Sequence, residues 1–195
     1  MRIFILPATV FTGEMSTQKT IRQEAGSVAE SALRLDTDKA EQIIDALNTE
    51  LAASYVMYHQ VKKHHWNVEG PEFRDLHLYL DEVAEDLELA ADALAERVQA
   101  IGGVPHSTGT TFEEQSPISP EDENVYDIRT SLQNDLEGLG IMIETMRDHI
   151  ALTNELGDYT TEQLLRETLE DVEEHAHHLE HYLEDDSLVL ESGIN

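Results

Sequence analysis

The chain has 195 residues, 40% of them hydrophobic, which is enough for one domain with its own core. Its 12 Lys and Arg residues stand against 41 Asp and Glu residues, and the formal net charge of −29 argues against a phosphate-binding surface of the ordinary kind. The absence of cysteine excludes disulfide scaffolds, thiolate zinc sites and iron–sulfur clusters, so any bound metal must use His, Asp or Glu.

The acidic composition also predicts how the chain responds to salt. Repulsion among so many carboxylates destabilises a compact state at low ionic strength, and salt screens that repulsion. We therefore expect a halophilic protein that works in a salty cytoplasm and whose stability rises from low to high salt. No apolar run approaches the roughly 18 residues of a membrane-spanning helix, so we expect no membrane as a partner.

The ends of the chain are expected to lie outside the folded domain. The apolar run in residues 1–11 is broken by Pro7 and no small-residue cleavage site follows it, so we do not interpret it as a signal peptide. Met15 is a second potential start, which makes residues 1–14 an extension, and residues 15–35 are expected to form a mobile or loosely docked tail. The predicted division is 1–36 for extension and tail, 37–185 for a helical domain and 186–195 for a C-terminal tail.

Four long helices are predicted in the domain. Apolar residues recur at helical spacing in four stretches: from the candidate N-cap Asp36 to about His65, from Pro71 to the closing pair Gly102-Gly103, over residues 125–150, and over residues 165–183. The first and last pairs have short connections, which make antiparallel neighbours, whereas residues 102–120 are long enough to cross the bundle. This pattern predicts an all-α, ferritin-like four-helix bundle with one long crossover between the second and third helices.

The second helix carries a second stripe, one position away from the apolar one. Its members all lie on one face: His77, Asp81, Glu85, Glu88, Asp92 and Glu96. In so acidic a chain, a solvated face is the simpler interpretation of any one carboxylate. His77 with Asp81, and Asp92 with Glu96, are nevertheless one turn apart, so each pair is able to hold one ion.

The two pairs cannot share an ion within one chain. A rise of about 1.5 Å per residue places Asp81 roughly 16 Å from Asp92 along the helix. If the helix packs antiparallel against its copy across a twofold axis, the first pair of one subunit faces the second pair of the other, and two equivalent sites form. His65, at the end of the first helix, can complete each set. Imidazole and carboxylate ligands together suit iron, manganese or zinc more than calcium or magnesium.

Several motifs resemble the Dps family, the ferritin-like "DNA-binding proteins from starved cells". They are His65-Trp66-Asn67-Val68-Glu69-Gly70, Phe73, Leu76-His77-Leu78-Tyr79-Leu80-Asp81, Asp92-Ala93-Leu94-Ala95-Glu96-Arg97 and Gly102-Gly103-Val104-Pro105. The likeness is continuous over about 40 residues, and the four-helix pattern extends it over roughly 37–185.

The resemblance implies a function and an assembly. Members of this family form hollow twelve-subunit shells that oxidise Fe(II), preferably with hydrogen peroxide, at twofold interfaces and store ferric mineral inside. It also implies that Fe(II) and Fe(III) are bound at a shared ferroxidase site, and that the homo-oligomer takes iron and peroxide as substrates. His65, His77 and Asp81 would come from one subunit, and Asp92 and Glu96 from its partner.

Other residues have assignments with open alternatives. Glu85 and Glu88 would seed mineral if their face looks into the cavity, and they are solvated acids otherwise. Trp66 would quench a stray oxidant, although an aromatic anchor at the twofold interface is the interpretation we favour.

The last helix and the turn before it hold two further candidate clusters. Glu174, His177 and His181 would relay iron through a threefold pore, and a solvated surface cluster is the alternative we favour. Family analogy alone makes acidic funnel candidates of three residues around the turn between the third and fourth helices: Glu155, Asp158 and Glu162.

The charge of the chain departs from the family pattern. Many members bind DNA through tails rich in Lys and Arg, and this strongly acidic chain has no such tail, so we do not expect DNA binding. An iron-storing ferroxidase is therefore the first interpretation. A DNA-compacting nucleoid protein and a non-catalytic, metal-buffering helical bundle are the alternatives.

Overall fold

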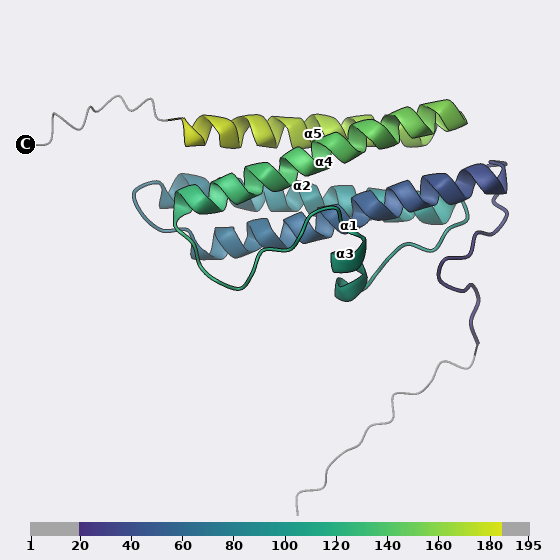
Figure 1. Cartoon of the computed structure of the whole chain (residues 1–195), viewed down its shortest axis with the longest axis horizontal. Helices are drawn as coiled ribbons and strands as arrows, with labels where there is room; N and C mark the ends of the chain where they lie inside the picture. Colours follow the sequence, from purple (N-terminus) through teal and green to yellow (C-terminus); the bar gives the residue numbers. More distant parts are fainter. Residues whose placement is uncertain (1–19, 185–195) are drawn as a thin grey trace, which may run out of the picture.

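The computed structural model describes residues 20–184, which form five helices and no strand. The helices are α1 (Thr37–Asn67), α2 (Phe73–Ala100), α3 (Gly109–Gln115), α4 (Ile128–Leu156) and α5 (Tyr159–Leu183). The four long helices lie lengthwise beside one another, and the short α3 lies on the outside of the bundle against α1 (Figure 1). The extensions predicted for residues 1–14 and 186–195 lie outside the described residues.

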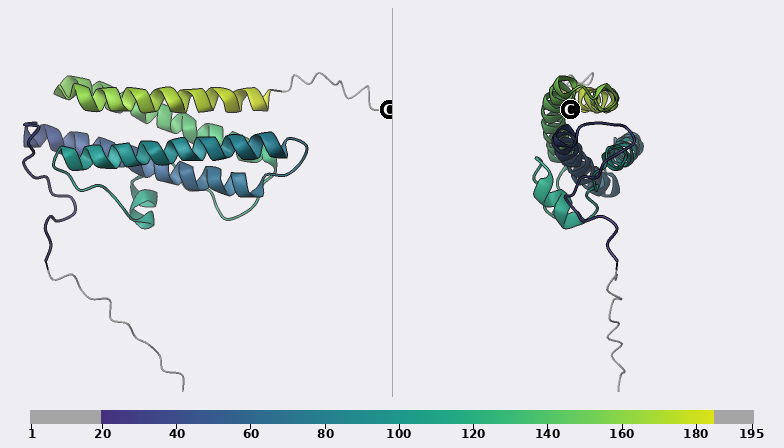
Figure 2. Two further views of the ribbon diagram at one scale, coloured as in Figure 1. Left: turned by 180° about the vertical axis from the view of Figure 1, so that it is seen from behind. Right: turned by 90° about the vertical axis from the view of Figure 1, so that its right-hand side faces the viewer.

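The chain order sets two antiparallel pairs, α1 with α2 and α4 with α5, each joined by a short turn. After α2 the chain runs back along the bundle, through α3, before α4 begins near the end where α2 also begins (Figures 1 and 2). This is the predicted bundle with one long crossover. None of the helices in residues 20–184 is long and apolar enough to span a membrane.

The apolar stripes meet in two clusters of buried residues along α1, and Phe112 and Leu169 pack against both clusters. Leu51 and Met57 on α1, Leu80 on α2 and Leu139 on α4 are all fully buried. The Met57 side chain of α1 packs directly on the α4 backbone at Gly138, where an added Cβ would come within 2.3 Å of the Met57 sulfur. Burial of these stripes removes apolar surface from water, which is the main force that holds the bundle together.

Two boundaries differ from the sequence prediction. α4 begins at Ile128, after Asp127 accepts a hydrogen bond from the backbone N–H of Thr130, so Val125 lies before the helix and is 63% exposed. The crossover contains α3, which the apolar pattern did not indicate. Phe112 of α3 stacks on Tyr55 of α1 with ring centroids 4.6 Å apart, and this contact fixes the crossover against the bundle.

Of the tail predicted over residues 15–35, the structure describes the part from residue 20 onward, and this part makes specific contacts with the bundle. The carbonyl of Gly102 accepts hydrogen bonds from the backbone N–H of Ala29 and from the Gln23 side chain, both at 2.9 Å. Gly102 has a φ of +96°, and a Cβ there would meet the Ala29 oxygen at 2.0 Å, so only glycine permits this approach. Val28 and Leu35 add apolar contacts with the core.

Candidate metal centre

The ends of α1 and α2 bring two histidines into a reciprocal arrangement. His65 Nδ1 lies 2.7 Å from the backbone oxygen of His77, and His77 Nδ1 lies 2.9 Å from the backbone oxygen of His65. A carbonyl only accepts, so both Nδ1 atoms carry the hydrogen and donate it. The rings stack 3.9 Å apart, and Phe73 stacks on His77. Both Nε2 atoms therefore keep a free lone pair in the neutral rings, which is the state that a metal ion needs.

Asp81 lies beside this histidine pair. Its Oδ1 is 3.8 Å from His65 Nε2, and its side chain is 40% exposed. The same oxygen accepts a hydrogen bond from Lys62, one turn before the end of α1. This hydrogen bond and the charge of Lys62 hold the pKa of the Asp81 carboxyl below its ordinary value, and the same bond raises the pKa of Lys62. In this structure the ammonium is the cation that the carboxylate binds.

Asp92 and Glu96 lie farther along α2, and both are exposed. The helix rise separates Asp81 from Asp92 by roughly 16 Å, as expected from the sequence. Within residues 20–184, no three His, Asp or Glu side chains are grouped so that one chain holds a metal ion. The structure thus places His65 next to His77 and next to Asp81, as pairs rather than as one group of three ligands, and leaves Asp92 and Glu96 apart. A site with all five needs a second copy of the chain.

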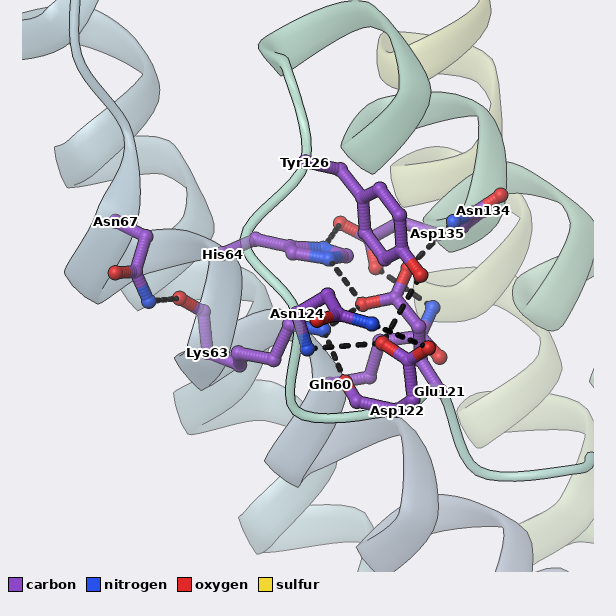
Figure 3. Close-up of polar contacts among 10 residues, drawn as sticks. All are labelled: Gln60, Lys63, His64, Asn67, Glu121, Asp122, Asn124, Tyr126, Asn134 and Asp135. Carbon is purple, nitrogen blue, oxygen red and sulfur yellow. Dashed lines mark hydrogen bonds and ion pairs between the residues drawn. The ribbon is translucent and has the colours of Figure 1, made fainter.

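His64, the neighbour of His65, has a different environment. It is 3% exposed, with Nδ1 at 2.8 Å from Asp135 of α4 and Nε2 at 2.9 Å from Glu121 of the crossover. Gln60 donates to the other Asp135 oxygen at 3.0 Å. Figure 3 shows these groups, with Lys63 also directed at Glu121, closing around the end of α1.

The charges in this network balance. Burial by itself lowers the pKa of His64, but hydrogen bonds to Asp135 and Glu121 and their negative charges outweigh it, so the net pKa is raised. Burial would raise the pKa of Glu121, yet hydrogen bonds from Lys63, Asn134 and His64 lower it. Both ring nitrogens lie within hydrogen-bond distance of a carboxylate, which only accepts, so this geometry and the raised pKa favour the imidazolium form of His64. Because both nitrogens donate, His64 has no lone pair for a metal ion.

The other residues to which the sequence analysis gave a role are either exposed to solvent or hydrogen-bonded within the chain. Glu85, Glu88 and Glu155 are exposed, and Trp66 is 68% exposed. Asp158 is buried at the start of α5, where it accepts two hydrogen bonds from Arg97, at 2.7 and 2.9 Å, and caps the helix.

Glu162, in the first turn of α5, is also bonded within the chain. It is nearly buried and accepts hydrogen bonds from Asn154 and Arg166. The roles proposed for these residues stay predictions. Hydrogen bonds within the chain hold the carboxylates of Asp158 and Glu162, so these two side chains are less free to move than solvated acids that line a pore.

On α5, His177 and His181 are exposed, and their Nε2 atoms lie 3.2 Å apart. Glu174, one turn earlier, is also exposed. The nearby His175 is buried instead and bonds Asp86 of α2 at 3.0 Å. The iron-transit role of Glu174, His177 and His181 stays a prediction.

Sequence reasoning did not find Lys62 or the His64 network. The only signal for His64 was its one-turn spacing from Gln60, because Glu121 and Asp135 are 57 and 71 residues away. Lys62 lies one turn before the end of α1 and 19 residues before Asp81. A lysine at that spacing from a ligand pair indicates a competing cation only once the two helices are placed side by side.

Comparison with known proteins extends this picture. The ferritin-like domain family matches residues 44–189. The DNA protection during starvation protein of Halobacterium salinarum is 58% identical over 181 residues, covering 92% of this chain and 100% of that protein. A crystal structure of an archaeal Dps homologue from the same organism has a TM-score of 0.87 and covers 91% of this chain and 99% of the other.

A more distant structure gives the same fold. The Dps protein of Vibrio cholerae, described as a member of a broad superfamily of ferritin-like diiron-carboxylate proteins, is 30% identical with a TM-score of 0.76. It covers 81% of this chain and 99% of its own. The bundle is therefore ferritin-like, and the chain belongs to the Dps family.

Proposed function

We propose that this protein is an iron-storing, iron-detoxifying ferroxidase that oxidises Fe(II) with hydrogen peroxide and keeps the ferric product inside an oligomeric shell. The observation that carries the proposal is the reciprocal pair of His65 and His77, in which both Nδ1 atoms are bonded and His65 Nε2 lies 3.8 Å from Asp81. Membership of the Dps family supports it, as does the diiron-carboxylate superfamily named for the Vibrio relative.

Each side chain has a distinct part in the proposed site. Asp81 and, from the partner subunit, Asp92 and Glu96 supply charged oxygens, which hold a hard cation most firmly. His65 and His77 supply neutral nitrogens whose direction is fixed by the hydrogen bonds to each other's backbone. The Lys62 ammonium keeps the Asp81 carboxylate paired while no iron is bound. Iron that enters the site displaces Lys62 from Asp81.

The proposed reaction balances without a further reagent. Two Fe(II) ions give one electron each, and hydrogen peroxide takes both electrons with two protons to become two water molecules. Because the oxygen–oxygen bond receives both electrons, no hydroxyl radical is released. The protection against oxidative damage follows from this two-electron stoichiometry.

The cellular setting is also part of the proposal. A homo-oligomer would bring the half-sites together, and a structurally similar thioferritin from Bacteroides fragilis is described as dodecameric. The net charge of −29 favours a salty cytoplasm, in keeping with the Halobacterium relative. Several relatives are named for DNA protection or DNA binding, but the same charge opposes direct DNA contact in this chain.

Stopped-flow iron oxidation tests the proposal. Anaerobic Fe(II)-loaded protein is mixed with hydrogen peroxide or with oxygen, and ferric absorbance is followed. We expect peroxide to be the faster oxidant, and we expect Asp92→Ala/Glu96→Ala to slow the reaction by at least about 100-fold, since even changes beyond the ligand sphere cost 10–100-fold. A double variant with the wild-type rate would contradict the ferroxidase proposal and is the result that the metal-buffering interpretation predicts.

A further inference from the structure

The C-terminal part of α5 carries two histidines whose side chains converge. His177 and His181 are one helical turn apart, and their Nε2 atoms lie 3.2 Å from each other. Their rings meet edge to face with centroids 4.4 Å apart. Both residues are exposed, so a solvated cation can reach the two nitrogens without any movement of the core.

The separation of these nitrogens matches the bite of a metal chelate. Two metal–nitrogen bonds of about 2.1 Å at tetrahedral or octahedral angles span roughly 3.0–3.4 Å between the nitrogens. A neutral imidazole with hydrogen on Nδ1 directs its Nε2 lone pair outward. Without a metal, one Nε2–H donates to the other. Metal binding requires that this hydrogen move to Nδ1 and that the exposed rings turn until both Nε2 lone pairs meet at one ion.

Other groups on the same face can add charge or further ligands. The Glu180 carboxylate lies 3.9 Å from His177 Nδ1, beyond hydrogen-bond distance, and adds negative charge beside the histidine pair. Glu174 and His178 are also exposed and lie one turn from His177 or His181. An ion bound by the histidine pair thus has negative charge nearby and keeps open positions for water.

We infer that His177 and His181 form a chelate for a borderline divalent transition-metal ion, a second metal site that the ferroxidase reaction does not require. Imidazole nitrogens bind Ni²⁺, Cu²⁺ and Zn²⁺ more tightly than Fe²⁺. The site therefore selects ions of the zinc class rather than iron.

This chelate is distinct from the ferroxidase half-site. Tyr79 is directed from α2 toward α5, where its hydroxyl donates a hydrogen bond to the backbone oxygen of His175 at 3.2 Å. The ring centroids of Tyr79 and His178 lie 5.7 Å apart. His77 and Asp81 flank Tyr79 in the sequence but contact α1 instead. The body of α2 thus lies between the two sites, and they do not share ligands.

The test is a calorimetric titration of the full-length protein with Zn²⁺. Because zinc also suits the ferroxidase ligands of both half-sites, the parent protein for this titration is His65→Ala/Asp81→Ala/Asp92→Ala/Glu96→Ala. We expect this parent to bind one Zn²⁺ per chain at α5, and we expect that ion to be lost when His177→Ala and His181→Ala are added. The inference is wrong if the zinc stoichiometry and affinity do not change.

A matched control uses another exposed histidine, His59 on α1. His59→Ala in the same parent should bind zinc as the parent does, and loss of binding there would contradict the assignment to α5. Alanine at exposed helical positions keeps the helix, which circular dichroism checks. Cu²⁺ provides a second readout, because its electron paramagnetic resonance spectrum should show two nitrogen ligands in the parent and none in the double histidine variant. The zinc result does not depend on whether iron oxidation follows the proposed function.

Discussion

Two adjacent histidines at the end of α1 have opposite environments. His64 points into the bundle, where both ring nitrogens are bonded to carboxylates and the ring is 3% exposed. His65 points toward α2, where one nitrogen donates to a carbonyl and the other remains free near Asp81. The count of bonded nitrogens, rather than residue type or position, separates a histidine that joins helices from one that is able to bind a metal.

The difference also shows how the open site is supported. The network of His64, Gln60, Glu121 and Asp135 joins α1, the crossover and α4 immediately next to His65. A ligand must be held in one orientation to bind well, and closely bonded neighbours provide that rigidity. This network around His64, the closed region, therefore fixes the end of α1 that carries His65. His65, His77, Asp81 and Lys62 form the open region, which depends on that helix end. If this division holds, substitutions in the closed region should mainly lower the free energy of unfolding, and substitutions in the open region should mainly change metal affinity.

The largest effect on stability is expected in the closed region. Asp135→Ala removes a fully buried carboxylate and leaves the His64 charge with one partner fewer. Breaking a buried ion pair from one side costs about 3–5 kcal/mol. Denaturant unfolding at a fixed protein concentration measures the loss. Asp148→Ala, an exposed position on the same helix, is the control, and equal effects of the two substitutions would show that the network contributes nothing special.

A smaller and pH-dependent effect is expected at Asp158. Burial raises its pKa, but hydrogen bonds from Thr161 and Arg97 outweigh burial, and the net pKa is lowered below 3.8. A lowered folded-state pKa stabilises the protein above the unfolded value, and this contribution is lost as pH falls through the folded one. Asp158→Asn keeps the helix cap but removes the charge, which should cost about 2 kcal/mol at neutral pH.

Unfolding of wild type and Asp158→Asn at neutral pH and at pH values below 3.8 measures this dependence. The difference in free energy of unfolding between wild type and variant should shrink in acid. A difference that stays constant would mean that the ion pair with Arg97 is not its source. If Asp158→Asn is as stable as the wild type at neutral pH, the result would instead favour the pore role for Asp158.

The smallest effect is expected at Lys62 in the open region. Lys62→Met removes the ammonium that competes with metal for Asp81 while keeping the length of the side chain. We expect tighter Zn²⁺ binding at the half-site by several-fold, measured by calorimetry in protein that also carries His177→Ala and His181→Ala. Lys63→Met is the matched control, because Lys63 bonds Glu121 and should affect stability but not zinc affinity. Unchanged or weaker zinc binding in Lys62→Met would contradict the competition.

Periodicity was sufficient to predict the long helices, because each buries one apolar stripe over many turns. The helix α3 has only seven residues and none of them is buried, so no stripe indicates it. Val125 continued the apolar pattern but lies outside α4, where the cap at Asp127 sets the start. Spacing placed His77 and Asp81 one turn apart, both residues lie on α2, and their joint role as ligands stays a prediction. The role of His64 depended on partners more than 50 residues away, which periodicity does not report.

A complementation experiment tests most directly the claim that two chains share each site. One variant, His65→Ala/Asp81→Ala, loses the first half-site, and another, Asp92→Ala/Glu96→Ala, loses the second. Each alone should oxidise iron slowly with peroxide. Random co-assembly of equal amounts should restore about a quarter of the wild-type sites, because half of the pairs are mixed and each mixed pair contains one complete site. If the mixed assemblies are no more active than the separate variants, iron is not held between two chains.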